Sequence, residues 1–145
     1  MLVQLILKSK AGSGVETVPS STSVSDAAVI LAEKKIGTVV VSDDGGKTAA
    51  GILSERDIVR ELAKSGGGCL TKPVGDYMTS DLVTCTSQTN VSEVLAMMTE
   101  GRFRHVPVVE NGEMVGLVSI GDVVKAQLSQ LAMEKDALEG MIMGH

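Results

Sequence analysis

The chain has 145 residues, of which 43% are apolar, but it holds no Trp, one Tyr and one Phe, so its core must be aliphatic. Thirteen basic and eighteen acidic residues give a formal net charge of −5, which argues against a nucleic-acid groove, because such a groove needs a basic surface. The longest apolar run is far shorter than the roughly 20 residues that span a bilayer, and no signal-peptide cleavage site follows the apolar start. We therefore expect a soluble, cytoplasmic protein that binds neither DNA nor a membrane.

The reactive side chains form no recognisable catalytic or metal-binding pattern. Cys69 and Cys85 fit no metal spacing and allow at most one disulfide, so we expect free thiols, which suit a reducing compartment. The sequence lacks a P-loop, a complete dinucleotide-binding glycine motif and a His-Glu-x-x-His motif. His105 has no nucleophile or acid grouped with it, which favours a packed corner residue over a proton-transfer role. We expect no metal site, no catalytic residue and no enzymatic activity.

Apolar spacing and turn residues predict alternating helices and strands in the first half of the chain. Ser23 or Ser25 is expected to cap one helix, which should end near Gly37, and Ser54 is expected to cap the next. A turn over residues 43–46 joins two strands. The expected helices cover residues 2–10, 24–35 and 55–65, and the expected strands cover 15–18, 38–41 and 49–53.

The second half repeats the first. Residues 74–78, 82–85 and 91–94 correspond to residues 3–7, 15–18 and 24–27, the last two pairs at an offset of 67, whereas residues 116–122 correspond to 51–57 at an offset of 65. The offset falls because the second hairpin turn, at residues 110–113, is two residues shorter, and a paired strand tolerates a length change in its turn. The repeated unit is strand–helix–strand–strand–helix.

Neither half is large enough to fold comfortably alone, so the halves should pack on each other. We predict an α+β fold in which two β-α-β-β-α repeats pack sheet to sheet with pseudo-twofold symmetry. Residues 1–65 form repeat 1, residues 66–73 the linker, residues 74–128 repeat 2 and residues 129–145 a C-terminal helical tail.

The tail carries apolar residues at helical spacing and has no partner inside either repeat. Leu128, Leu131, Leu138 and Ile142 follow one another in steps of three and four residues with one longer gap. This pattern favours pairing with a helix of a second subunit, and hence a homodimer. The alternative is that the tail folds back over its own core.

One stretch of sequence occurs twice and carries a family resemblance. Gly51–Asp57 and Gly116–Asp122 each place a serine and an aspartate three residues apart, where a strand passes into a helix. With Met78-Thr79 and the strand entry at residues 103–108, these motifs resemble a tandem cystathionine-β-synthase (CBS) domain pair, of the stand-alone Bateman type. The resemblance implies a regulatory module that binds AMP, ADP, ATP, NAD(H) or S-adenosylmethionine in two clefts between the repeats. The regulated protein would be a separate, unknown partner.

The resemblance also implies roles for individual residues. Asp57 and Asp122 correspond to the ribose ligands, and Ser54 and Ser119 to the hydroxyls beside the phosphate. Arg102, Arg104 and His105 are candidates to reach the phosphate held by the other repeat. The residues implied to line one adenine pocket are Thr17, Ile36, Gly37, Thr38 and Val39. Those implied to line the other are Thr84, Arg104, His105, Val106 and Pro107. Arg56 and Ile120 complete the set of candidate residues.

Elementary chemistry is compatible with these roles and also with simpler ones. A carboxylate accepts two hydrogen bonds from a ribose diol, and a helix N-terminus offers free amides to phosphate. Serine caps and first-turn acids, however, stabilise a helix without any ligand. Gly121 stands where repeat 1 has Arg56, so we expect two unequal sites. The alternatives are a structural dimerisation module with vestigial clefts and, disfavoured by the lack of a catalytic group, an enzyme acting on a bound nucleotide.

Overall fold

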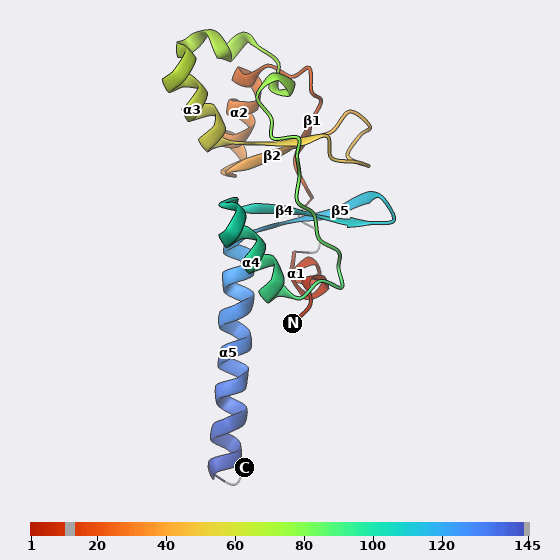
Figure 1. Cartoon of the computed structure of the whole chain (residues 1–145), viewed down its shortest axis with the longest axis vertical. Helices are drawn as coiled ribbons and strands as arrows, with labels where there is room; N and C mark the ends of the chain where they lie inside the picture. Colours follow the sequence, from red (N-terminus) through yellow and green to blue (C-terminus); the bar gives the residue numbers. More distant parts are fainter. Residues whose placement is uncertain (11–13, 144–145) are drawn as a thin grey trace.

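Two small β-sheets face each other in the middle of the molecule, and helices cover their outer faces (Figure 1). The computed structural model describes residues 1–10 and 14–143. The first sheet has the order β1-β2-β3 and the second pairs β4 with β5. The prediction of an α+β fold built from two repeats packed sheet to sheet is confirmed. The strands are β1 (Thr17–Val18), β2 (Thr38–Val41), β3 (Gly51–Ser54), β4 (His105–Glu110) and β5 (Glu113–Ser119), and the helices are α1 (Val3–Ser9), α2 (Val24–Lys34), α3 (Glu55–Ser65), α4 (Val91–Gly101) and α5 (Ile120–Met143).

The two repeats agree in detail at the ends of their first long helices. The residue after α2, Lys35, and the residue after α4, Arg102, both adopt left-handed backbone, with φ of 55° and 56°. The prediction that Gly37 ends the first of these helices is therefore wrong by two residues. Gly37 instead lies at the corner before β2, where its carbonyl accepts a 2.8 Å hydrogen bond from the Glu55 amide at the start of α3.

The first strand is the place where the repeats differ most. β1 covers the last two of the four residues expected to be extended, 15–18, and pairs in parallel with β2. The corresponding segment of repeat 2, residues 82–85, forms only an isolated bridge between Cys85 and Val108 instead of the predicted strand. Two backbone hydrogen bonds, Cys85 N to Pro107 O and Val109 N to Cys85 O, hold this bridge.

Each hydrophobic core is completed by a segment that lies in the other half of the sequence. Val3 and Ile6 of α1 are buried in the core of the second sheet, whereas Val74, in the 3₁₀ turn η2 (Val74–Asp76), is buried in the core of the first. Both exchanged segments press against the glycine that begins one of the two repeated motifs, Gly51 at the start of β3 and Gly116 in the middle of β5. A Cβ on Gly51 would lie 2.5 Å from Met78 Sδ, and one on Gly116 would lie 2.5 Å from Leu7 Cδ2. Glycine at these two positions therefore permits the exchange.

The segment predicted as the linker, residues 66–73, is mostly helical. A 3₁₀ helix, η1 (Gly66–Thr71), follows α3 directly, and Cys69 within it is 1% exposed. Lys72 O then accepts a hydrogen bond from the Val24 amide at the start of α2. These contacts attach the segment to the first repeat.

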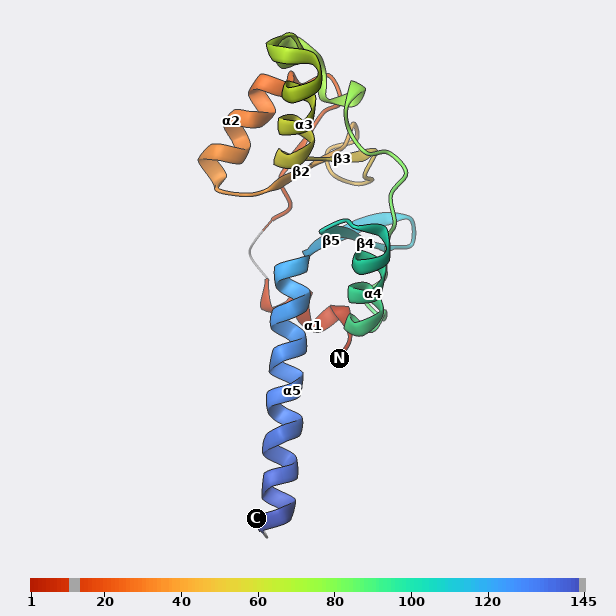
Figure 2. The same ribbon diagram turned by 60° about the vertical axis from the view of Figure 1, so that its left-hand side comes forward.

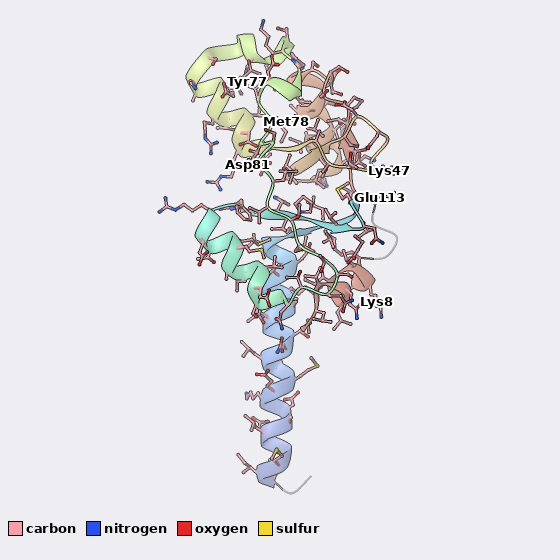
Figure 3. All side chains as sticks on the ribbon, turned by 45° about the vertical axis from the view of Figure 1, so that its right-hand side comes forward. Lys8, Lys47, Tyr77, Met78, Asp81 and Glu113 are labelled. Carbon is pink, nitrogen blue, oxygen red and sulfur yellow. The ribbon has the colours of Figure 1, made fainter. Side chains whose placement is uncertain are left out.

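The hairpins of the two repeats touch on one side of the molecule. The Met114 amide donates a 2.8 Å hydrogen bond to Lys47 O, and Lys47 Nζ lies 3.5 Å from a carboxylate oxygen of Glu113 (Figure 3). Asp81, which Figure 3 also labels, lies in the connection that passes from one sheet layer to the other. The sheets are thus joined along one edge, and cavities lie between them elsewhere.

Helix α5 packs on its own repeat only near its start and then runs out from the body (Figure 2). Val123 is fully buried and Ala126 packs against the second core, but Leu128, Leu131 and Leu138 are each about 60% exposed. The tail therefore does not fold back over its own core. Within residues 1–10 and 14–143, no helix combines the length and apolar character that crossing a membrane requires.

Candidate functional site

Two cavities between the repeats share part of one wall. The smaller has a volume of about 540 Å³ and the larger about 640 Å³, and Gly37, His105 and Ser119 line both. The smaller cavity is lined by residues 36–38, at the corner between α2 and β2 of repeat 1, and by Ser119 of repeat 2. The larger cavity is lined by Ser54 of repeat 1 and by residues 101–105, at the corner between α4 and β4 of repeat 2. Each cavity is therefore built by both repeats.

All four arginines of the chain line the larger cavity. Arg56 and Arg60 project from the first turns of α3, and Arg102 and Arg104 come from the corner between α4 and β4. Among the described residues, Arg60 makes an ion pair, a 3.4 Å contact with Asp57, and the other three arginines make none. Unpaired guanidinium groups bind phosphate and carboxylate through paired N–H donors. A chain with a net charge of −5 thus places its arginines around one cavity.

The serine and aspartate of each motif form a reciprocal helix cap. In α3 the Asp57 amide donates to Ser54 Oγ at 3.2 Å, and the Ser54 amide donates to Asp57 Oδ2 at 2.9 Å. The same two bonds, of 3.1 and 2.9 Å, join Ser119 and Asp122 at the start of α5. In both motifs one carboxylate oxygen is therefore committed to the cap.

The helix N-termini are less open than the sequence suggested. The first amides, of Glu55 and Ile120, donate to Gly37 O and Arg104 O, each at 2.8 Å, and the third amides donate to the capping serines. Within the described part of the chain, only the second amide of each first turn, of Arg56 and Gly121, lacks a partner. The expectation of a cluster of free amides for phosphate is wrong, because the corner carbonyls and the caps occupy most of them.

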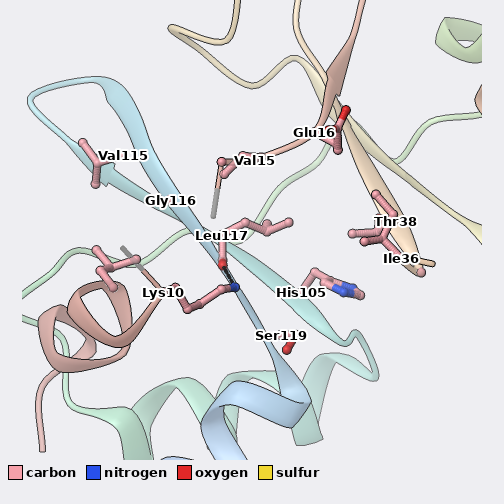
Figure 4. Close-up of a pocket in the computed structure, with 13 residues that line it drawn as sticks. Lys10, Val15, Glu16, Ile36, Thr38, His105, Val115, Gly116, Leu117 and Ser119 are labelled. Atoms are coloured by element: carbon pink, nitrogen blue, oxygen red, sulfur yellow. Dashed lines mark hydrogen bonds between the residues drawn. The ribbon is translucent and has the colours of Figure 1, made fainter. Parts of the chain in front are cut away.

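At the edge of the smaller cavity, Lys10 forms an ion pair with Asp122, and Figure 4 shows Lys10 with its hydrogen bond to the backbone of Leu117. Lys10, at the end of α1, donates a 2.8 Å hydrogen bond to Asp122 Oδ2 and a 2.9 Å bond to Leu117 O. Burial raises the pKa of Asp122, but the bonds from Lys10 and Ser119 and the lysine charge outweigh it and hold that pKa below 3.8. The carboxylate of Asp122 is thus neutralised by Lys10, which itself lines the smaller cavity.

His105, which faces both cavities, is held in its neutral form. Burial lowers its pKa below 6.5, and the positive charges of Lys10 and Arg104 lower it further, although the Asp122 carboxylate acts in the opposite direction. A neutral imidazole can donate one hydrogen bond and accept another at pH 7.

The structure brings most of the predicted site residues to the cavities. The larger cavity is lined by Ser54, Arg56 and Asp57 of repeat 1 together with the corner between α4 and β4 of repeat 2. Arg60, which the sequence analysis did not identify, lies one helical turn after Arg56, and this spacing was visible in the sequence. Lys10 was also missed. The predicted residues that line a cavity are Ile36, Gly37, Thr38, Ser54, Arg56, Asp57, Arg102, Arg104, His105, Ser119 and Ile120.

Six predicted residues do not line either cavity: Thr17, Val39, Thr84, Val106, Pro107 and Asp122. Val39 and Val106 are fully buried in the two hydrophobic cores, because successive strand residues point to opposite faces of the sheet. Glu16 lines the smaller cavity in place of Thr17, and Val83 lines the larger in place of Thr84.

Known proteins resemble this chain in sequence and in fold. The family model of the CBS domain matches residues 12–64 and 74–129. The mitochondrial CBS domain-containing protein CBSX3 of Arabidopsis thaliana is 38% identical over 125 residues; these cover 84% of this chain, which spans 61% of that protein's length.

Solved structures give the same result. A CBS-domain containing protein from Agrobacterium tumefaciens is 43% identical, with a TM-score of 0.82 over 88% of this chain and 99% of the other. A CBS domain protein from Pyrobaculum aerophilum, complexed with AMP, is 29% identical, with a TM-score of 0.77 over 92% and 99%. The CBS domain pair of protein MJ0100, in complex with 5′-methylthioadenosine and S-adenosylmethionine, is 26% identical, with a TM-score of 0.76 over 90% and 98%. The two matched segments cover most of the chain, which therefore belongs to the CBS-domain family.

Proposed function

We propose that this chain is a regulatory module that binds an adenosine-containing ligand between its repeats and modulates a separate protein. The convergence of all four arginines on the larger cavity, beside Ser54 and Asp57, carries the proposal. The ligands of the two related proteins, AMP in one and 5′-methylthioadenosine with S-adenosylmethionine in the other, share the adenosine group. We propose no catalytic step, and we propose the cytoplasm as the place where the module acts.

The larger cavity has a suitable group for each part of an adenine nucleotide. Its volume of about 640 Å³ is within the range of roughly 300–1,000 Å³ that small-molecule sites occupy. Leu82, Val83 and Phe103 offer apolar surface to the base. Asp57 Oδ1, which contacts only the mostly exposed Arg60, is available to a ribose hydroxyl, and Arg56 is placed for phosphate.

The two cavities should bind with unequal strength. A ribose hydroxyl at Asp122 competes with a 2.8 Å charge-assisted bond from Lys10, whereas at Asp57 it competes with a 3.4 Å contact. The smaller cavity is lined by one lysine and the Glu16 carboxylate, whereas the larger is lined by four arginines and three carboxylates, so phosphate is attracted more strongly to the larger. The larger cavity is therefore the proposed site for AMP, ATP or NAD(H), and the smaller suits a ligand with less negative charge.

Regulation would follow from the shared wall. Because Gly37, His105 and Ser119 line both cavities, a ligand that shifts the repeats relative to each other in one cavity changes the shape of the other. Different affinities for two arrangements of the repeats are enough to couple ligand binding to the affinity for a partner protein.

A thermal-shift panel of AMP, ADP, ATP, NAD, NADH, S-adenosylmethionine and unphosphorylated adenosine tests the proposal. A ligand at 100 times its Kd adds about 2.7 kcal/mol to the free energy of unfolding. Arg56→Met should reduce the shift given by phosphorylated ligands more than the shift given by adenosine. Lys64→Met is the matched control, because Lys64 lies at the far end of the same helix and lines neither cavity.

The competing proposal is a structural dimerisation module with vestigial clefts. The reciprocal caps favour it, since they give Ser54 and Asp57 a structural role without any ligand. It gains support if no member of the panel raises the unfolding midpoint, or if Arg56→Met and Lys64→Met change every shift equally. Chromatography of the nucleotides after incubation tests for enzymatic turnover, and recovery of a product would overturn the non-catalytic proposal.

A further inference from the structure

One face of α5 is apolar, exposed and directed away from the body to which the helix belongs. The residues of this face recur in alternating steps of four and three along the helix, and the apolar side chains among them are 42% to 84% exposed. We call this set the seam: Val124, Leu128, Leu131, Lys135, Leu138 and Ile142. Val123 and Ala126, which pack against the second core, and Gln130, which accepts a hydrogen bond from the Met1 amino group, lie on a different face of the helix.

Alternating steps of four and three residues are the signature of a coiled coil. Two helices with this repeat bury their seams by supercoiling around each other. A single charged residue within the seam, here Lys135, restricts which alignments are stable. We propose that the seam binds the seam of a second copy of this chain, with the two α5 helices antiparallel. This proposal does not depend on what the cavities bind.

Charge selects the antiparallel arrangement. In a parallel pair, Lys135 would lie against Lys135 of the second copy and Glu134 beside Glu139 of the second copy, so like charges would meet at both places. In an antiparallel pair centred near residue 133, Leu128 faces Leu138 of the second copy and Lys135 faces Leu131. Glu134 lies beside Glu134 of the second copy, so one like-charge contact remains, against three in the parallel pair. Lys125 then lies beside Glu139 of the second copy, and this ion pair occurs twice.

The proposed contact leaves both functional cavities open. The seam from Val124 to Ile142 extends over about 27 Å at 1.5 Å per residue, so the two bodies are held at opposite ends of the pair. The cavities lie between the sheets, on the far side of the second repeat from the tail (Figure 1). Ligand binding and pairing of the tails are therefore compatible.

Sedimentation velocity on the full chain tests the contact. The wild type should be a dimer, and Leu131→Asp should weaken self-association by at least about tenfold, because it places a charge at the centre of the seam. Met133→Asp is the control, since Met133 is also exposed but lies on the opposite side of the helix, and this variant should remain a dimer. A monomeric wild type, or a dimer that Leu131→Asp does not weaken, would overturn the proposal.

Charge reversal tests the direction of the helices. In the antiparallel pair, Glu139→Lys and Lys125→Glu should each weaken the dimer, and the double variant should restore it. The rescue must act between chains, because residues 125 and 139 are about 21 Å apart along one helix. In a parallel pair, Glu139→Lys would instead strengthen the dimer by attracting Glu134. Circular dichroism of each variant checks that the helix, including its Lys135–Glu139 contact, remains formed.

Single-cysteine variants give an independent answer. Leu128→Cys mixed with Leu138→Cys should form a crosslinked heterodimer on oxidation if the helices are antiparallel, because these two positions face each other. Crosslinking of each variant only with itself would show a parallel pair and overturn the proposal. The natural thiols of Cys69 and Cys85 are buried and should not interfere.

Discussion

Replacing Lys10 by methionine should separate the structural role of this lysine from its effect on the smaller cavity. Methionine retains the aliphatic stem and removes the ammonium group, which bonds to Asp122 Oδ2 at 2.8 Å and to Leu117 O at 2.9 Å. The Lys10 side chain is 35% exposed and that of Asp122 is 23% exposed, so solvent only partly screens the pair.

The stability cost follows from this geometry. A hydrogen bond to a charged group contributes roughly 1.5–3 kcal/mol net, and partial exposure reduces the loss for Lys10→Met to about 1–2 kcal/mol. For a domain of this size, that loss lowers the melting temperature by about 3–6 °C. Lys8→Met should have almost no effect, because Lys8 is exposed on the same helix and makes no ion pair with a described residue.

The dependence on pH has a definite sign. Lys10 helps to hold the pKa of Asp122 below 3.8, so the stabilisation is complete above that value and is lost as pH falls through the lowered pKa of the folded protein. The difference between wild type and Lys10→Met should be largest near pH 7 and should disappear in acid. The pKa of His105 should rise in the variant, because a nearby positive charge is removed.

Thermal unfolding measured from pH 7 to pH 3 tests the stability difference, and an NMR titration of the His105 imidazole tests the change in its pKa. Adenosine binding should strengthen in Lys10→Met, because the substitution frees the Asp122 carboxylate from its bond with Lys10. Equal stability of wild type and Lys10→Met at pH 7, or a difference that persists unchanged at pH 3, would refute the reasoning. An unchanged pKa of His105 would show that the charge of Lys10 does not reach the shared wall.

Two further predictions concern packing and thiol chemistry. Gly51→Ala should lower the free energy of unfolding by about 1–3 kcal/mol in chemical denaturation, because the new Cβ would lie 2.5 Å from Met78 Sδ. Gly67→Ala is the control and should be nearly neutral, because a Cβ there has nothing within 4 Å. Equal effects of the two substitutions would contradict the close approach at Gly51. Cys85 should react with a thiol reagent only after unfolding, because burial, with a smaller effect of the Glu110 charge, raises its pKa to about 11. Cys69 is also buried and should be protected in the same way. Rapid labelling of the native protein would contradict this prediction.

The repeat and most of its elements were predictable because they depend on local signals. The serine caps, the β-branched run at residues 38–41 and the two turns each specify structure within a few residues. Their recurrence at offsets of 67 and 65 residues made the duplication visible. The end of α2 was misplaced because Lys35 adopts the left-handed conformation that glycine usually takes.

The exchange of segments was not predictable from pattern alone. The spacing of Val3 and Ile6 indicates a helix, but nothing local indicates that this helix packs against residues 85–123 and not against its own repeat. Lys10 was missed for the same reason, since its partner Asp122 is 112 residues away. The segment predicted as a strand at residues 82–85 forms only one bridge, at Cys85. The sequence of these four residues does not indicate that the strand is absent.

For the candidate site, the motif residues Ser54, Asp57 and Ser119 line a cavity between the repeats, whereas Asp122 does not, and the roles of all four toward a ligand stay predictions. The strand residues Val39 and Val106 were placed on the wrong side of their sheets. A motif extends over consecutive residues, but a strand presents only every second one to the same face. Arg60 lies outside the motif and joins the site only through the helical repeat that follows it.

The exchanged segments have a consequence for any break in the chain near Gly67. The fragment before the break carries Val3 and Ile6, which fill the second core, and the fragment after it carries Val74, which fills the first. Each fragment thus lacks a piece of its own interior and holds the piece that the other needs. The halves of this protein are expected to regain structure only by complementation, as two interlocked chains.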